Sequence, residues 1–163
     1  MATKNTPTST MDQGLLKRNT AMSLKEFSDH WYNKHGAIVA PYFLHSGISY
    51  YAQIHGPLSS GNPDLDVSEW DGAAAMPAQE ILDNPPPTPQ WKKDYYLEVI
   101  LPDERRFLVS EALEHIKRIP PQTVTGDLRV VIENGKPLID IPETVWELWR
   151  EYEKRGEQEQ KST

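Results

Sequence analysis

The stretch "DHWYNKHG" at residues 29–36 sets two histidines among aromatic side chains. Imidazole has an unperturbed pKa of about 6.5 and exchanges protons near neutral pH, so His30 and His35 are candidates for acid–base chemistry. For metal binding, two ligands from one helix normally stand four residues apart, whereas a five-residue spacing turns the rings about 140° from each other. No HxxxH or HxH spacing occurs in the chain. We therefore expect proton transfer and no metal site.

A second set of candidates lies in "PYFLHSGISYYAQIHG". Its alternation predicts a half-buried strand, and if Ile48 and Ala52 face the core, Tyr50 faces inward with them. A buried tyrosine needs a partner for its hydroxyl, which a phenol or carbonyl group of a substrate would provide. His45 and Tyr42 flank the same region and would complete a polar end to a pocket.

Structural roles are the alternative for the same side chains. His35 would then hydrogen-bond a backbone carbonyl at the end of its helix, and His30 would lie on the flank beside Lys34 or bond Asp29. Tyr50 would be a core aromatic residue with its hydroxyl on the backbone. The sequence leaves both readings open.

The element that positions the histidines is a helix. Ser23 and Glu26 stand at capping-box spacing, so the helix is predicted to begin just after Ser23. Gly36 stands where a left-handed glycine commonly ends a helix. Between them, residues spaced three and four apart share a face that we expect to point at a sheet. These residues are Leu24, Phe27, Trp31 and His35.

The other elements are predicted from periodicity and turn signals. Strands are expected over residues 14–19 and 47–56, followed by a polar loop over 56–68. A further strand would begin at Trp70 and become helical after Met76.

Beyond the proline-rich "NPPPTP", a helical pattern runs over residues 90–119. It is expected to break at Pro102, where Asp103 would cap a second helix. The pair Asn134 and Gly135 predicts a two-residue hairpin turn. A C-terminal helix follows, whose apolar stripe must cover the domain or a second subunit. The stripe consists of Ile141, Val145, Leu148, Trp149 and Tyr152.

Composition narrows the class of protein. A chain of 163 residues suits one domain, and the absence of cysteine excludes disulfides and thiolate chemistry. The net charge of -7 and the lack of basic runs argue against a nucleic-acid partner. No span of about 20 apolar residues and no apolar leader occur, so we expect no membrane partner and a cytoplasmic location.

The expected domain organisation has three parts: a flexible N-terminus (1–11), an α+β domain (12–141) and a C-terminal amphipathic helix with its tail (142–163). Helices on one face of a small antiparallel sheet fit this order of elements.

Five segments together carry a resemblance to a known family. They are "KRNTAMSLKEFSDHWYNKHG", "ISYYAQIH", "WDG", "DYYLEVILPDERRFL" and "VVIENGKPLI". From about Leu15 to Ile139 the chain resembles the EthD-type domain of the dimeric α+β-barrel superfamily, and more narrowly small fungal EthD-type proteins of polyketide pathways. The motif positions that match are His30, Trp31, His35, Gly36, Asp103 and Glu104.

The resemblance implies a fold and a way of working. It implies a ferredoxin-like, four-stranded antiparallel sheet, a homodimer in which two sheets form a barrel, and catalysis without metal or organic cofactor. The superfamily also includes monooxygenases, cyclases and heme-handling proteins, so it leaves the reaction open.

The resemblance, together with the candidate histidines and tyrosine, implies a cofactor-independent lyase of secondary metabolism. The reaction expected is decarboxylation of an anthrone-type β-keto carboxylic acid derived from an aromatic polyketide. His35 would stabilise the oxyanion and reprotonate carbon, Tyr50 would donate a second hydrogen bond, and His30 and His45 would assist. The residues expected to contact the substrate are Phe27, Trp31, Tyr42, Ile48 and Ala52. The alternatives are a dehydratase, an aldol-type cyclase, a cofactor-free oxygenase, and a non-catalytic dimeric binder of a hydrophobic metabolite.

Overall fold

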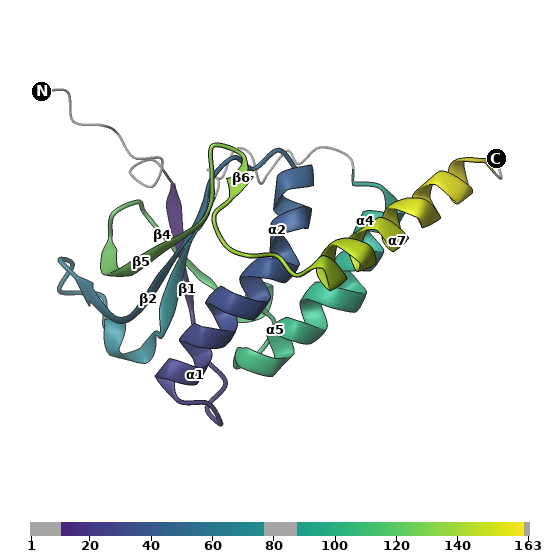
Figure 1. Cartoon of the computed structure of the whole chain (residues 1–163). Coiled ribbons are helices and arrows are strands. Elements are labelled where there is room, and N and C mark those ends of the chain that lie inside the picture. The colour runs from purple at the N-terminus through teal and green to yellow at the C-terminus, as the bar shows by residue number, and fades with distance from the viewer. Residues whose placement is uncertain (1–10, 77–87, 162–163) are drawn as a thin grey trace, which may run out of the picture.

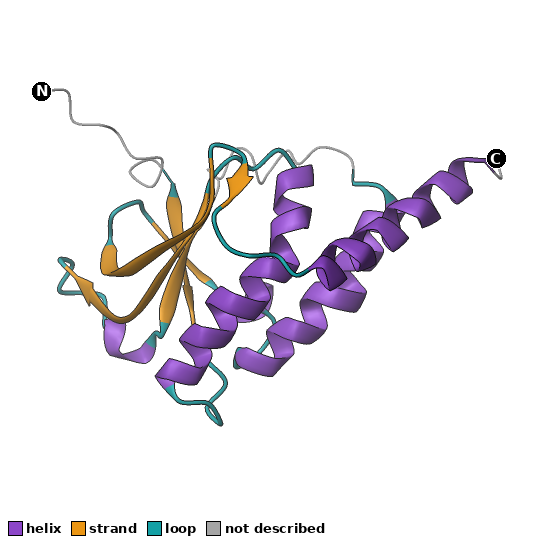
Figure 2. Ribbon diagram, viewed as in Figure 1, coloured by secondary structure: helices purple, strands orange, loops and turns teal. Residues whose placement is uncertain are grey.

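Antiparallel strands form one sheet in the computed structural model, which describes residues 11–76 and 88–161. Within these residues the strands are β1 (Asp12–Leu16), β2 (Tyr51–Ser60), β3 (Gly72–Met76), β4 (Lys117–Ile119), β5 (Val124–Glu133) and β6 (Lys136–Pro137). They lie in the order β4-β1-β3-β2-β5-β6. The long helices gather on one side of the sheet (Figures 1 and 2). The predicted α+β class is therefore confirmed.

The sheet has six strands in the described part of the chain, where four were expected. β4 comes from a segment with a helical pattern, yet it pairs with β1 at one edge. The hairpin supplies β5 and β6, and β5 pairs along β2. The helical turn expected after Met76 falls outside the described residues, as does most of the N-terminal segment.

Strand β2 is as long as predicted but begins four residues later, at Tyr51. It continues to Ser60, so residues 56–60 belong to the sheet and not to a loop, and its register against β5 shifts between His55 and Ser59. The connection that follows contains a short 3-10 helix, η3 (Val67–Glu69). The hairpin turn is confirmed, because Asn134 has a φ of 53° and Gly135 a φ of 72°, the two positive values that a tight turn of this kind needs.

The first long helix is continuous through α1 (Leu24–Asp29), the π-helical turn η2 (His30–His35) and α2 (Gly36–His45). Its predicted start is confirmed: the Ser23 hydroxyl accepts from the Glu26 amide, and the Ser23 amide donates to the Glu26 carboxylate, each at 3.1 Å. The predicted end at Gly36 is wrong. Gly36 is right-handed, with φ -55°, and the left-handed glycine is Gly47, with φ 81°, just beyond α2.

Gly36 serves close packing instead of capping. A Cβ atom at this position would lie 3.3 Å from Ile139 Cδ1 and 3.7 Å from Gln53 Nε2. The absence of a side chain therefore lets the helix approach the sheet and the segment after β6.

The second long helix joins α4 (Gln90–Tyr95), the π-helical turn η4 (Tyr96–Ile100) and α5 (Leu101–Phe107). The break expected at Pro102 is wrong. Pro102 stands in the first turn of α5, directly after the π-helical turn, where the hydrogen-bond pattern changes and a missing N–H is tolerated. The capping role predicted for Asp103 is wrong as well, because its carboxylate contacts another helix. A short helix, α6 (Ala112–His115), follows.

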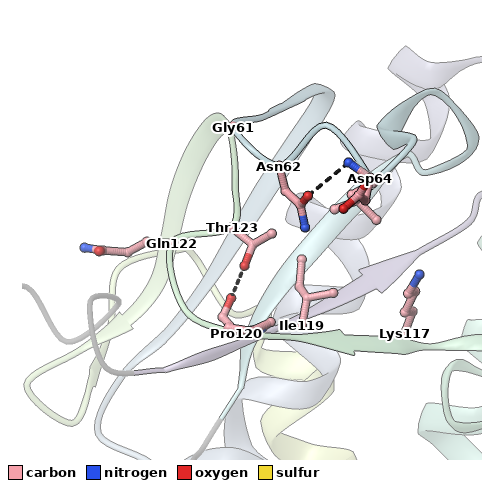
Figure 3. A pocket seen from close by; sticks show the side chains of 9 residues that line it. Gly61, Asn62, Asp64, Lys117, Ile119, Pro120, Gln122 and Thr123 are labelled. Atoms are coloured by element: carbon pink, nitrogen blue, oxygen red, sulfur yellow. Dashed lines mark hydrogen bonds between the residues drawn. The ribbon is translucent and has the colours of Figure 1, made fainter.

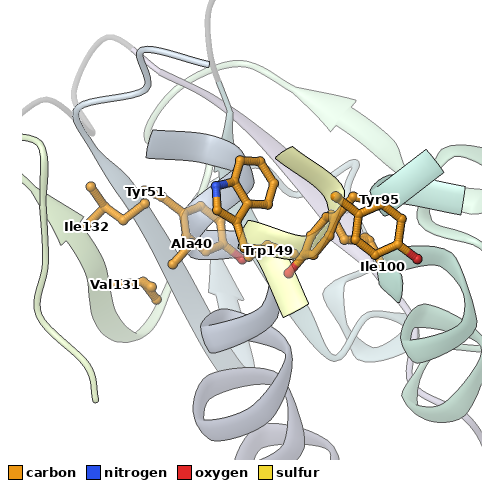
Figure 4. Close-up of a cluster of buried hydrophobic side chains, with 9 residues drawn as sticks. Ala40, Tyr51, Tyr95, Ile100, Val131, Ile132 and Trp149 are labelled. Carbon is orange, nitrogen blue, oxygen red and sulfur yellow. The ribbon is translucent and has the colours of Figure 1, made fainter. Parts of the chain in front are cut away.

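The C-terminal helix α7 (Glu143–Lys161) runs beside α4 (Figure 1). Trp149 is buried there, with its ring 4.8 Å from that of Tyr95 and 5.2 Å from that of Trp91. Figure 4 shows Trp149 and Tyr95 within the same buried cluster as Tyr51 of β2. The apolar stripe of α7 thus covers the helical layer of its own chain.

Candidate functional site

The π-helical turn brings His30 and His35 onto one carboxylate. His30 Nε2 lies 2.9 Å from Asp103 Oδ1, and His35 Nδ1 lies 2.8 Å from Asp103 Oδ2. In a π-helical turn the backbone N–H donates five residues back, as Gly36 does to Trp31, so side chains at i and i+5 fall one turn apart on the same side. The expectation that the two rings diverge was wrong because it assumed α-helical geometry.

The cluster of His30, His35 and Asp103 is nearly closed to solvent. Asp103 is 0% exposed and His35 is 6% exposed. The ring of Phe107, one turn further along α5, lies 5.0 Å from that of His30 and 4.7 Å from that of His35. Arg106 adds a distant, largely exposed cation, with Nη1 3.7 Å from Asp103 Oδ1.

The surroundings set the charge of this cluster. Burial alone would raise the pKa of Asp103, but the hydrogen bonds from His30 and His35 outweigh it and hold that pKa well below its usual range. For His35 the balance is reversed, since burial lowers its pKa more than the Asp103 carboxylate raises it. The favoured state is therefore an ionised Asp103 beside a neutral His35.

This arrangement fixes the tautomer of His35. An ionised carboxylate can only accept, so the Nδ1 of His35 carries the proton and donates it to Asp103. The lone pair then sits on Nε2, which leaves that atom to exchange protons, while Asp103 stabilises the imidazolium if the ring is charged.

His35 makes its hydrogen bond and its ring contact with Asp103 and Phe107 of α5, so its side chain points to the second long helix, where the sheet was expected. Trp31 is the residue of this turn that faces the sheet: its ring lies 4.7 Å from that of His55, and its carbonyl accepts from Gln53 Nε2 at 3.0 Å. Phe27 packs between Trp31 and Phe107, at 5.5 and 5.7 Å.

The row of β2 that faces the helices consists of Tyr51, Gln53 and His55. Tyr50 is on the opposite face, in a cluster with Ala52 and Ala75, so its predicted inward position was wrong. The phase of the alternation was ambiguous because both faces of this central strand are buried: Tyr50 and Tyr51 are each 7% exposed. The polar residues Gln53 and His55 were the signal in the sequence that could have identified the helix-facing side of β2, because they alternate with Tyr50 and Ala52.

The helix-facing row is joined by hydrogen bonds. Gln53 Nε2 lies 3.2 Å from the Tyr51 hydroxyl, and His55 Nε2 lies 2.8 Å from Gln53 Oε1. Burial raises the pKa of Tyr51 to about 12 and lowers that of His55 to about 4, so both side chains are neutral near pH 7.

The remaining predicted residues lie away from the histidine cluster. His45 is at the far end of α2, beside Trp91 and Trp149, about 15 Å along the helix from His35. Tyr42 contacts Tyr96, and Ile48 packs on the cluster beneath α7.

Neither Asp103 nor Glu104 was predicted as a site residue: both were motif positions, and Asp103 was also expected to cap a helix. Glu104 is buried, and burial raises the pKa of its carboxyl group to about 7. A hydrogen bond of 3.3 Å from the Ala112 amide acts in the opposite direction and lowers that pKa, but by less. The signal that marks both carboxylates is their place on an apolar helical face, since Ile100 and Phe107 stand three residues before and four residues after Asp103.

Two surface cavities stand out, and neither is lined by His30 or His35. One, of about 440 Å³, lies between the end of β2 and the β4–β5 turn, where Asn62 and Thr123 make local hydrogen bonds (Figure 3). The other, of about 420 Å³, is lined by Tyr32, Asn33, Leu138, Ile139 and Asp140.

The described residues hold neither a metal-binding cluster nor a membrane-spanning helix. Over residues 11–76 and 88–161, no three His, Cys, Asp or Glu side chains are arranged to hold a metal ion. Among the helices of this same part of the chain, none has the length and apolar character needed to cross a bilayer.

Comparison with known proteins gives one family. The model of the EthD domain matches residues 19–111, which include the π-helical turn, β2, β3 and the second long helix. No curated protein and no solved structure matches the chain significantly. Because the match covers more than half of the sequence and contains all three members of the His30, His35 and Asp103 cluster, the chain belongs to the EthD domain family.

Proposed function

We propose that the protein is a cofactor-independent lyase that decarboxylates an aromatic β-keto carboxylic acid of the anthrone type. The observation that carries the proposal is the buried contact of 2.8 Å between His35 Nδ1 and Asp103. It gives one imidazole a fixed tautomer and an orienting carboxylate, which is what proton transfer to a carbon atom requires.

The reaction passes through an enolate and needs one proton from the protein. As carbon dioxide leaves, the electrons of the broken carbon–carbon bond pass into an enolate, which then takes up one proton. His35, which is neutral at rest, first takes up a proton from solvent on Nε2 and then donates it to the enolate carbon, so the ring returns to its neutral state. Asp103 stabilises the imidazolium that exists between these two steps. The second hydrogen bond, first assigned to Tyr50, is assigned to Tyr51, because Tyr51 is the tyrosine on the helix-facing side of β2.

The test compares His35→Gln with the wild type on anthrone-type carboxylic acids. Loss of one preorganised donor costs about 2.7–4 kcal/mol, so turnover should fall at least a hundredfold. His45→Gln is the matched control, because it removes an exposed histidine of the same helical segment. Circular dichroism verifies that both variants fold. Near-normal turnover in His35→Gln would refute the assignment.

The products separate this reaction from its rivals. Release of carbon dioxide supports decarboxylation, loss of water a dehydratase or cyclase, and consumption of oxygen an oxygenase. Tight binding without any turnover would leave a binding protein for a hydrophobic metabolite.

We also propose that the order β4-β1-β3-β2 is the ferredoxin-like core of the domain, and that two copies pair through their sheets. Membership of the family and this strand order support the proposal. Light scattering after gel filtration tests it, since a mass near 18.6 kDa would show a monomer.

A further inference from the structure

The two oxygens of the Asp103 carboxylate each receive one histidine. His30 Nε2 lies 2.9 Å from Oδ1, and His35 Nδ1 lies 2.8 Å from Oδ2. Asp103 is 0% exposed, so solvent contributes little to either oxygen. Arg106 is a weaker neighbour, since its Nη1 is 3.7 Å from Oδ1 and its side chain is 62% exposed. One negative charge is therefore divided mainly between two imidazole rings.

This division couples the protonation of the two rings. An ionised carboxylate only accepts, so neutral His30 carries its proton on Nε2, as neutral His35 does on Nδ1. A further proton on either ring makes an imidazolium, whose stabilisation depends on the same carboxylate. Burial lowers the pKa of His35 most, the Asp103 carboxylate raises it, and a charge on His30 lowers it further. The part of the carboxylate charge that stabilises His30 is thus lost to His35.

The groups around the cluster come from both long helices. In α5, Glu104 and Arg106 stand beside Asp103, and both interact with its carboxylate. They are the same in the wild type and in any variant of His30, so their effect on His35 cancels in a comparison. Between the two histidines, His30 is the more exposed, with 14% of its side chain accessible against 8% for His35. His30 is therefore the member of the cluster that can be changed with the least disturbance of the core.

We propose that His30 is a positioning residue that sets how readily His35 takes up its proton. By donating to Oδ1, His30 holds the Asp103 carboxylate in the orientation that His35 needs, and it withholds part of the carboxylate charge from His35. Without that donor the whole charge is available to His35, which then accepts a proton at higher pH. The inference rests on the proposed function only in that this proton is the one given to the enolate.

The test follows the titration of His35 by NMR in protein labelled with ¹⁵N-histidine, without any substrate. In His30→Phe the new ring can keep the stacking on Phe107, at 5.0 Å and 25°, but it has no donor for Oδ1. The proton affinity of His35 should rise about tenfold. His30→Gln, which restores an N–H donor, should give a smaller rise. His45→Phe is the matched control and should leave the titration of His35 unchanged. A His35 titration in His30→Phe that is unchanged, or that moves to lower pH, would overturn the proposal.

A second measurement needs no variant. In the wild type, the resonances of His30 and His35 should each respond to protonation of both rings, since the rings share one carboxylate. Two independent, single-step titrations would overturn the proposal even if His30→Phe does not fold.

The pH profile of turnover separates this inference from the lyase assignment. Where turnover is found, its loss on the alkaline side should move to higher pH in His30→Phe, because His35 then keeps its proton to higher pH. A shifted titration of His35 in a protein without any turnover would support the role of His30 and refute the proposed function alone.

Discussion

Replacing Asp103 with Asn tests the buried cluster on which the proposed chemistry depends. The substitution preserves the volume of the side chain but removes the charge that receives hydrogen bonds from His30 and His35 at 2.9 and 2.8 Å. Hydrogen bonds to a charged group contribute about 1.5–3 kcal/mol each, and an amide can still accept one of the two. Since Asp103 is 0% exposed, solvent cannot compensate the loss. We expect the free energy of unfolding to fall by about 3 kcal/mol at pH 7.

The assay is urea and thermal unfolding followed by circular dichroism. For a chain of this length, about 3 kcal/mol corresponds to a melting temperature lower by about 6–12 °C. Arg106→Gln is the matched control, because it removes the exposed cation 3.7 Å from the same carboxylate and should change stability by about 0.5 kcal/mol or less.

The pH dependence gives a second readout of the same variant. The folded-state pKa of Asp103 lies below its ordinary value of 3.8, so its contribution is complete above that pH and is lost as the pH falls further. The difference in unfolding free energy between wild type and Asp103→Asn should therefore be full at pH 7 and shrink below about pH 4. A variant as stable as the wild type at pH 7 would refute the reasoning.

Two further predictions concern stability. His55 has a folded pKa of about 4 against 6.5 in the unfolded chain, so its contribution is complete above pH 6.5 and is lost as the pH falls to about 4, by up to about 3 kcal/mol (a gap of 2.5 at 1.36 kcal/mol each). His55→Phe should flatten the measured decline of unfolding free energy over this range, and an unchanged slope would contradict the assignment. Gly72→Ala would place a Cβ 2.5 Å from Trp31 Cζ3, so urea unfolding should show a loss of about 1–3 kcal/mol, whereas Gly61→Ala, with open space around it, is the control and should show little change.

The sequence correctly predicted those parts of the fold that depend on interactions between residues close together in the chain. The start of the first helix depends on Ser23 and Glu26, three residues apart, and the hairpin turn on Asn134 and Gly135. In each case the interacting groups are near neighbours, so the pattern alone determines the geometry.

The candidate site escaped prediction where it depends on contacts far apart in the chain. Asp103 meets His35 across 68 residues, and no local pattern pairs them. The inward face of β2 was misassigned because Tyr50 and Tyr51 are equally buried, so hydrophobicity does not distinguish the two sides of a strand in the middle of a sheet. The helix break predicted at Pro102 failed for a third reason: the adjacent π-helical turn removes the penalty that proline carries in an α-helix.

The π-helical turn over His30–His35 holds one residue more than an α-helical turn of the same reach. Five residues in the π-helical turn and four in α-helical winding each complete about one turn, so the extra residue is absorbed within the turn itself. Val39 and Ala40, which follow the turn, therefore reach the core as they would from an uninterrupted helix. A single-codon deletion within "HWYNKH" would convert the turn to α-helical winding and leave the face of the following helix nearly unchanged.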